Sequence, residues 1–242
     1  MNQSRIPDVI LVPQGTEYRA VRRALHGLTT SEVRVIPIPI GIEPTTRYLQ
    51  HWVAEILPHR PPAIVLGLAG SVSPQVSVAD VVVYRECGYR HPQRGMVTLE
   101  CDRSLTERVQ AKLALSGEPV RGLTCDRIIT EAEEKQSLAR VAAVVDMEGF
   151  AILQVLQNAG FPVAMVRVAS DGFEDSLPPL DGAIDPEGNL QPFPLALAMM
   201  KHPARSLKLI RNSLRALSVL SQTTRTLFPT NPSHRSQSLN PQ

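Results

Sequence analysis

Two short acidic segments hold the residue types best suited to chemistry. Asp146, Met147 and Glu148 directly follow the apolar run AAVV, and Ser170 and Asp171 directly follow PVAMVRVA. Each run has the length and composition of a buried strand, and the residues between the segments have helical spacing that ends at a glycine. Such a strand–helix–strand unit would bring both acidic ends to the carboxyl edge of one sheet, where open α/β folds bind ligands.

Carboxylates crowded at such an edge are chemically useful. A carboxyl in a pocket with few partners stays protonated near neutral pH, whereas an ionised carboxylate accepts hydrogen bonds on two oxygens. Each residue also has a purely structural interpretation. Ser170 and Asp171 are good helix caps. Glu148 would be favoured in a first helical turn, Met147 would pack in the core, and Asp146 would only orient the turn.

The elements that position these segments alternate between strands and helices. The predicted strands are residues 8–13, 32–40, 63–66, 80–84, 96–99, 120–129, 142–145 and 162–169, and the predicted helices are 15–25, 45–57, 104–115, 131–139 and 150–159. The helix at 104–115 would start at a Ser104 cap, and Lys135 would lie on a solvated helix face. This alternation predicts a three-layer αβα sandwich around a mixed, largely parallel central sheet, with one hairpin at 80–99.

Composition excludes several classes of protein. The 242 residues contain no apolar run near the roughly 20 that a membrane span needs, and the first residues have no signal-peptide core. The cysteines and histidines have no metal-ligand spacing, so we expect reduced thiols, no metal and no cofactor. An aromatic content of 4% argues against nucleic acid as a partner. These features predict a cytoplasmic protein.

Charge divides the chain near residue 188. Residues 1–187 carry 18 Lys/Arg and 23 Asp/Glu, whereas residues 188–242 carry seven Lys/Arg and no acid. A helix predicted at 204–220 would place four aliphatic side chains on one side and four cations on the other, which are Leu207, Ile210, Leu214 and Leu217, and Arg205, Lys208, Arg211 and Arg215. Two interpretations stay open: the apolar stripe contacts an anionic inner membrane surface, or it packs on the body or on another subunit.

These observations predict three parts of the chain. Residues 1–187 would form a catalytic domain, residues 188–220 a basic helical extension, and residues 221–242 a polar, disordered tail.

The ordered set of motifs resembles a known superfamily. GLAGS after a strand, VADVVV, VVDMEGFAI and VRVASD are similar in order and spacing, over residues 8–175, to the purine nucleoside phosphorylases and nucleosidases, which include the methylthioadenosine and adenosylhomocysteine nucleosidases. The segments AIDPEGNLQ and HPARSLKLIRNSLRAL resemble the C-terminal part of the hopanoid-associated phosphorylase branch, which is thought to remove adenine from an adenosylated lipid. The resemblance implies a small-molecule purine nucleoside as substrate and a homo-oligomer.

The resemblance also implies roles for individual residues. Asp171, in the Ser170-Asp171 pair, would protonate N7 of the purine and make the base a better leaving group. Glu148 would accept hydrogen bonds from both ribose hydroxyls, and Met147 would lie along the sugar.

A glycine-rich turn follows the strand at 63–66. Gly67, Ala69 and Gly70 are small enough for backbone N–H groups to approach an anion or a nucleophile. The resemblance assigns this loop to contacts with phosphate, water or ribose.

Residues 15–19 fit two different reactions. In the similar nucleosidases a glutamate at the place of Glu17 activates water. In the similar phosphorylases a Gly-x-x-x-Arg pattern grips phosphate, and Gly15 and Arg19 have that spacing. Val65 stands where the hexameric phosphorylases carry a further arginine, and Leu68 replaces a usual hydroxyl residue, so phosphate as co-substrate is in doubt.

The sequence therefore predicts an enzyme that cleaves the N-glycosidic bond of a purine nucleoside, with adenine favoured as the base. Water and phosphate both remain candidates for the attacking group, and a 5′-substituted or lipid-linked adenosine is a candidate substrate. The alternative is a nucleoside-binding protein that has lost catalysis.

Overall fold

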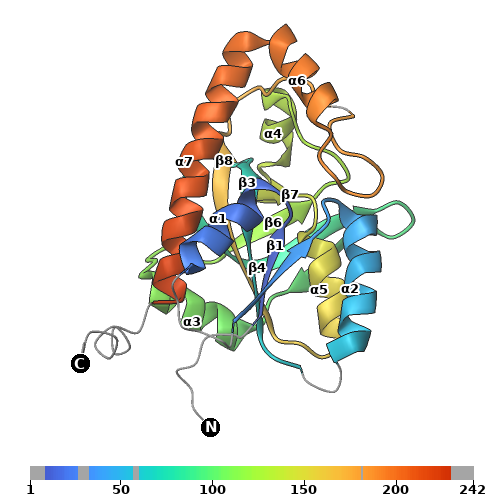
Figure 1. Ribbon diagram of the computed structural model, residues 1–242, viewed down its shortest axis with the longest axis vertical. Helices are drawn as coiled ribbons and strands as arrows, with labels where there is room; N and C mark the ends of the chain where they lie inside the picture. Colours follow the sequence, from blue (N-terminus) through green and yellow to red (C-terminus); the bar gives the residue numbers. More distant parts are fainter. Residues whose placement is uncertain (1–8, 27–32, 57–59, 181, 230–242) are drawn as a thin grey trace, which may run out of the picture.

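A single mixed sheet of eight strands lies between two layers of helices (Figure 1). The computed structural model describes residues 9–26, 33–56, 60–180 and 182–229. Its strands are β1 (Val9–Pro13), β2 (Arg34–Ile38), β3 (Ala63–Ser71), β4 (Val81–His91), β5 (Gly95–Glu100), β6 (Val120–Thr124), β7 (Val144–Asp146) and β8 (Val163–Asp171). Its helices are α1 (Thr16–Leu25), α2 (Ile42–Ile56), α3 (Arg103–Leu113), α4 (Ala132–Leu138), α5 (Gly149–Asn158), α6 (Pro192–Lys201) and α7 (Pro203–Leu227).

Part of the sheet closes on itself. The main order is β2-β1-β3-β7-β6-β4-β5, and β8 pairs with both β3 and β4. The strands β3, β8, β4, β6 and β7 therefore form a closed ring, in which β8 is parallel to β3 and antiparallel to β4. β8, the last strand in the sequence, thus has a partner strand on each side.

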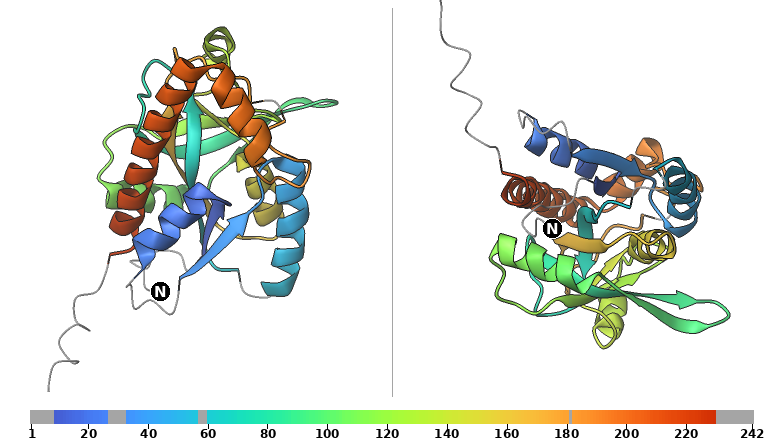
Figure 2. Two further views of the ribbon diagram at one scale, coloured as in Figure 1. Left: turned by 45° about the horizontal axis from the view of Figure 1, so that its top comes forward. Right: turned by 90° about the horizontal axis from the view of Figure 1, so that it is seen from below.

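The two helical layers explain why the central strands are apolar on both faces. α1, α3 and α7 cover one face, and α2 and α5 cover the other (Figure 2). Along β3, Ile64 and Leu66 pack toward α1 and α7, whereas Val65 packs in the opposite core, and all three are fully buried. Strands covered on both faces carry apolar side chains continuously instead of alternating with polar ones.

The predicted three-layer αβα sandwich with a mixed, largely parallel sheet is confirmed. The predicted hairpin is also present, because β4 and β5 pair in antiparallel fashion. Two details differ. The cap of α3 is Asp102, whose carboxylate accepts a hydrogen bond from the Leu105 N–H at 2.8 Å, and not Ser104. The last helix continues to Leu227, so residues 221–227, predicted in a disordered tail, are helical; residues 230–242 lie outside the described part of the chain.

The C-terminal helix is part of the body. α7 packs against α1 and β8, with Ala216, Leu220 and Leu227 fully buried on its inner side. In the described residues, no helix is both long and apolar enough to cross a membrane.

Candidate active site

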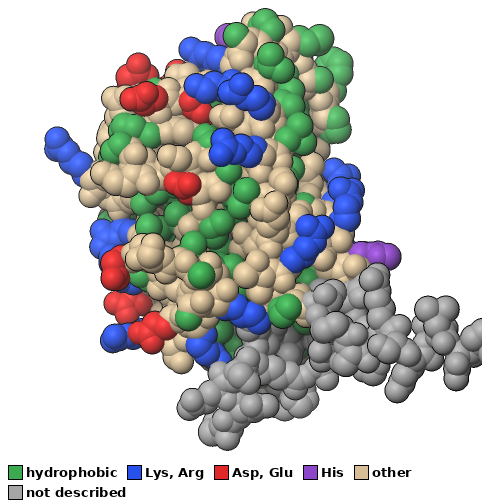
Figure 3. Space-filling model, turned by 90° about the vertical axis from the view of Figure 1, so that its left-hand side faces the viewer, with side chains coloured by type: hydrophobic (Ala, Val, Ile, Leu, Met, Phe, Trp, Pro, Cys, Tyr) green, Lys and Arg blue, Asp and Glu red, His purple; other side chains and the backbone are tan. Residues whose placement is uncertain are grey.

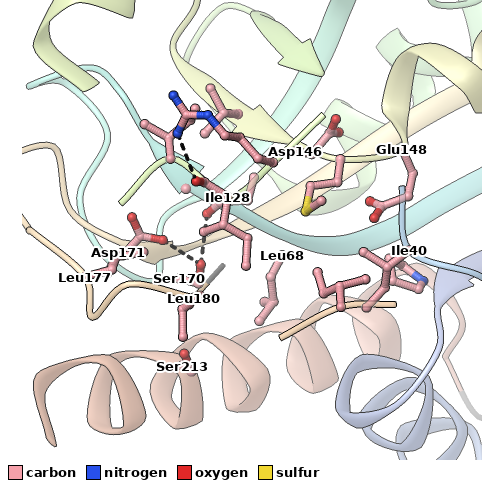
Figure 4. A pocket seen from close by; sticks show the side chains of 18 of the residues that line it. Ile40, Leu68, Ile128, Asp146, Glu148, Ser170, Asp171, Leu177, Leu180 and Ser213 are labelled. Carbon is pink, nitrogen blue, oxygen red and sulfur yellow. Dashed lines mark hydrogen bonds between the residues drawn. The ribbon is translucent and has the colours of Figure 1, made fainter. Parts of the chain in front are cut away.

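A cavity of about 320 Å³ opens where β3, β7 and β8 end (Figure 4). This volume is at the lower end of the range of about 300–1,000 Å³ usual for small-molecule sites. Its walls are formed by Pro13, Glu17, Ile40, Leu68, Ala69, Gly70, Arg127, Ile128, Ile129, Val145, Asp146, Met147, Glu148, Ser170, Asp171, Leu177, Leu180, Ile184, Leu190, Leu209 and Ser213. Aliphatic side chains dominate the wall, and the carboxylates are few and lie deep.

The two acidic segments meet here through β3. The sequence suggested that β7 and β8 are neighbouring parallel strands, but they do not pair with each other. Instead β3 lies between them, antiparallel to β7 and parallel to β8. Gly70 pairs with Val145 on one side and Asp171 on the other, so the two strand ends converge on one small residue. A Cβ on Gly70 would lie 3.2 Å from Asp171 Oδ2 and 3.3 Å from Val145 Cγ2.

One end of the cavity contains Asp171 and Ser170 (Figure 4). The Ser170 hydroxyl donates a hydrogen bond to Asp171 Oδ2 at 2.9 Å. Lys135 donates to Asp171 Oδ1 and, at 3.0 Å, to the carbonyl of Gly172. Burial raises the pKa of Asp171 above its ordinary value, and the charge of Lys135 opposes that rise.

Lys135 corrects a prediction. The sequence placed this residue on a solvated face of a charged helix, but its side chain is fully buried. A buried ammonium group needs a counter-ion, because desolvating an isolated charge is costly. Asp171 supplies that counter-ion.

The other end of the cavity contains Glu148 and Met147. Glu148 Oε1 accepts a hydrogen bond from the Gly41 N–H at 3.2 Å, and Glu148 Oε2 lies 3.8 Å from Arg167 Nη2. Burial raises the pKa of Glu148 to about 8, although Arg167 opposes the rise. Glu148 therefore has a pKa near neutral pH, and in either protonation state its oxygen atoms can accept hydrogen bonds from a pair of hydroxyls.

Arg167 links the carboxylates, and reasoning from the sequence missed it. Its side chain is fully buried, and its Nε and Nη2 donate to Asp146 Oδ2 at 3.2 and 3.0 Å. Asp146 also accepts from the Tyr84 hydroxyl and the Gly149 N–H, so it fixes both Arg167 and the turn into α5. The available signal was an arginine in the middle of an otherwise apolar strand, which requires a buried partner.

Arg167 Nη1 is left with no hydrogen-bond partner within the described residues. It lies against the backbone of Gly67, where a Cβ would overlap Nη1 and would lie 2.9 Å from Glu17 Oε1. Buried guanidinium nitrogens normally have an acceptor. Nη1 and Glu17 Oε1 therefore both lie close to the backbone of Gly67.

Glu17 lies on the first turn of α1, where its carboxyl points inward. Glu17 Oε1 accepts a hydrogen bond from the Leu68 N–H at 2.6 Å. Burial raises the pKa of Glu17 to about 7; the Leu68 hydrogen bond and the charge of Arg167 oppose the rise, whereas Asp146 adds to it. A carboxyl with a pKa near neutral pH is suited to accept a proton as a general base.

The structure separates the two halves of the 15–19 segment. Glu17 lines the cavity, but Gly15 and Arg19 are exposed and do not line it. Gly15 has a φ of 95° and begins α1. Gly67 is also absent from the cavity wall, because it lies behind Leu68 against Arg167. Among the residues described, no group of three or more His, Cys, Asp or Glu side chains could hold a metal ion.

Gly67 gives a direct test of this packing. We expect Gly67→Ala to lower the free energy of unfolding by about 1–3 kcal/mol, because the added methyl displaces the anchored Arg167 side chain. Thermal unfolding would measure this loss. Gly117→Ala is the matched control, since a Cβ there meets open space, and wild-type stability in Gly67→Ala would contradict the packing argument.

Known structures share this fold. The protein is similar to futalosine hydrolase of Helicobacter pylori, with a TM-score of 0.65 and 15% identity over 90% of this chain and 95% of that one. It is also similar to the 5′-methylthioadenosine/S-adenosylhomocysteine nucleosidase of Neisseria meningitidis, with a TM-score of 0.64 and 14% identity over 90% and 96% of the two chains. For the corresponding nucleosidase of Helicobacter pylori, the TM-score is 0.62 and the sequence identity is 17%, over 89% of this chain and 96% of that one. At these identities the likeness shows the fold alone.

Sequence comparison shows the family. No curated protein sequence matches the chain closely enough to show a relationship. The sequence profile of the phosphorylase superfamily, in contrast, matches residues 16–185, which include Glu17, the 67–70 turn, Glu148 and Asp171. The protein therefore belongs to the phosphorylase superfamily.

Proposed function

We propose that the protein hydrolyses the N-glycosidic bond of a purine nucleoside, with adenine as the base. The observation that carries the proposal is the arrangement at the two ends of one cavity. A buried carboxyl with a raised pKa, Asp171, lies at one end. At the other end, the carboxyl of Glu17, whose pKa burial raises to about 7, lines the cavity, and Arg167 Nη1 lies behind it against Gly67, outside the cavity wall.

The proposed reaction breaks the bond between C1′ of the ribose and N9 of the base. The bonding electron pair leaves with the base, and Asp171 donates a proton to N7, so that the base departs neutral. A water molecule beside Glu17 adds its oxygen to C1′ and passes its proton to Glu17, while the charge of the buried Arg167 guanidinium favours the ionised form of Glu17 that accepts the proton. Glu148 contacts the ribose hydroxyls and Met147 the sugar, which orients C1′ between acid and base.

The electrostatics favour water over phosphate. A phosphate dianion beside Glu17 would be repelled by Asp146 and by Glu17 and Glu148 in their ionised forms, and the Arg167 charge that opposes these carboxylates is already paired with Asp146. Water carries no charge and avoids this repulsion. Arg19, the residue expected to grip phosphate, is exposed and outside the cavity wall.

We also propose that the substrate carries an apolar group at the 5′ position of its ribose. Much of the cavity wall is aliphatic, and part of it comes from the segment that leads into the C-terminal helices. The aliphatic residues are Ile40, Leu180, Ile184, Leu190 and Leu209. The resemblance of residues 183–217 to the hopanoid-associated branch supports a lipid-linked adenosine.

The test is adenine release from 5′-alkylthioadenosines of increasing chain length, with and without phosphate. We expect release that does not need phosphate, free sugar as the product, and a kcat/KM that rises with the alkyl chain. A phosphate requirement with a sugar 1-phosphate product would contradict hydrolysis. Tight binding without any release of base would instead support the non-catalytic nucleoside-binding alternative.

The proposed role of Glu17 as the base predicts how kcat/KM in the same assay depends on pH. Because a base must be ionised, we expect kcat/KM to rise with pH through about 7, the pKa that burial gives Glu17. Glu17→Gln should lose about 10²–10⁴-fold in rate and should lose this rising limb. Glu43→Gln, a change in the first turn of a different helix, is the control. An unchanged pH profile in Glu17→Gln would assign the limb to another group.

A further inference from the structure

Helix α6 is apolar on all sides, and none of its residues is buried. Its sequence is PFPLALAMMK, and the exposed fractions of Phe193 and Met200 are 79% and 71%. A helix that is hydrophobic all round normally lies inside a protein or in lipid. Ten residues span only about 15 Å, half of a bilayer core, so α6 cannot cross a membrane. The helix therefore needs a surface partner.

Helix α7 extends the same apolar surface. Its inner side is buried against α1 and β8, but Leu207, Ile210 and Leu214 are 70%, 43% and 62% exposed. The predicted apolar stripe also included Leu217, which is half-buried and packs against the body, whereas the body leaves the other three largely uncovered. In Figure 3, the face that includes α7 shows hydrophobic side chains and Lys/Arg side by side over its upper part.

Cations border this apolar surface. Lys201, Arg211 and Arg215 are exposed and form no ion pair with any described residue. Two neighbouring cations are already neutralised, because Lys208 pairs with Asp175 at 2.5 Å and Arg205 with Glu131 at 3.6 Å. The sequence contains no Asp or Glu after Glu187.

We propose that this surface docks on an anionic lipid bilayer. The α6–α7 face, as we call it, consists of Phe193, Leu197, Met200, Leu207, Ile210 and Leu214 with the cations Lys201, Arg211 and Arg215. Apolar side chains enter the boundary between head groups and acyl chains, while adjacent Lys and Arg side chains attract anionic head groups. The short, wholly apolar α6 and the cationic border both fit that partner.

Charge argues against a second copy of the chain as the occupant. A two-fold interface places the same patch of both copies together. Here that patch would bring the cations of both copies into one interface, and neither α6 nor α7 contains an acidic residue to pair them. An anionic lipid surface, in contrast, supplies the missing negative charge.

The docking face borders the cavity through Leu190. This residue lies two positions before the start of α6, lines the cavity and is 49% exposed. A bilayer beneath the α6–α7 face would therefore lie next to the cavity's aliphatic wall. Delivery of an amphiphilic nucleoside by this route rests on the proposed function, whereas docking itself does not.

The experiment is co-sedimentation of the full-length protein with vesicles. Vesicles of phosphatidylcholine alone and of phosphatidylcholine with phosphatidylglycerol are compared, at low salt and at about 1 M salt, where charge interactions are screened. We expect binding to the anionic vesicles that salt weakens. Arg211→Glu with Arg215→Glu should lower the partition coefficient about tenfold or more, and Phe193→Asp with Met200→Asp should lower it at both salt concentrations.

Matched controls separate docking from folding and from catalysis. Arg108→Glu reverses an exposed cation on α3 and should leave vesicle binding unchanged. All variants should keep wild-type thermal unfolding and wild-type cleavage of a soluble nucleoside, because the changed residues lie outside the cavity. Absence of binding to anionic vesicles would overturn the proposal. So would a stable dimer in vesicle-free solution that Phe193→Asp converts to monomers, because that result would assign the face to a second copy.

Discussion

Replacing Asp171 by asparagine is expected to lower kcat by about 10²–10⁴-fold while the protein stays folded. General acid catalysis contributes about that much, and an amide cannot donate an acidic proton to N7 of the base. The substitution keeps the size of the side chain and its acceptor for Ser170. Single-turnover release of adenine would measure the chemical step, and wild-type turnover in Asp171→Asn would refute the mechanism.

A substitution of Lys135 tests the role of Asp171 as the acid. The charge of Lys135 lowers the pKa of Asp171 and so favours its ionised form. Lys135→Met removes the opposing charge, so burial alone acts and the pKa of Asp171 should rise further. The falling limb of the pH–rate profile should then move to higher pH, which a merely structural role for Lys135 would not cause. Lys112→Met, on α3, is the control and should leave the profile in place.

Replacing Arg167 by methionine is expected to destabilise the protein by about 3–5 kcal/mol at pH 8. The change leaves Asp146, Glu148 and Glu17 without their shared counter-charge, and removing one partner of a buried ion pair costs about that amount. It should also slow hydrolysis, because Glu17 loses the guanidinium charge that favours its ionised form. Denaturant unfolding of the full chain at several pH values would measure the free energy of unfolding.

The pH dependence of that loss has a definite sign. In the wild type, the pKa values of Glu17 and Glu148 are raised to about 7 and about 8, from an ordinary value of 4.5. Their contribution to stability is therefore complete below about pH 4.5 and is lost as pH rises through 7–8. The deficit of Arg167→Met should be smaller at pH 5, where both carboxyls hold protons. Adding Asp146→Asn should restore part of the stability, and a deficit that is the same at pH 5 and pH 8 would contradict this account.

Much of the fold could be predicted, because it depends on local patterns. Apolar runs followed by glycine or acidic residues marked β3, β7 and β8, and the structure has strands there. The 146–148 and 170–171 segments were expected to lie together, and they border one cavity. The reason for their proximity is not the one predicted. β7 and β8 are not adjacent strands; β3 lies between them, and its Gly70 pairs with the ends of both.

The remaining features depend on long-range pairing, which single residues do not reveal. Lys135 looks like any lysine in a charged helix until Asp171, 36 positions later, becomes its partner. Arg167 sits within a strand, and its importance follows only from Asp146 and Gly67 on other strands. The apolar stripe of α7 was visible in the sequence, but which side faces the body depends on how α7 packs on α1 and β8.

The closed ring of strands also affects the order in which the chain folds. β8 pairs with β3 at a sequence separation of 100 residues, and contacts so distant in sequence form slowly because a long loop must close first. Until β8 inserts, β3 and β4 expose unpaired edges that can join another chain. Arg167, Ser170 and Asp171 all arrive on that strand, so an incompletely folded chain has neither the acid nor the guanidinium. Recovery of activity during refolding would therefore report closure of the ring itself.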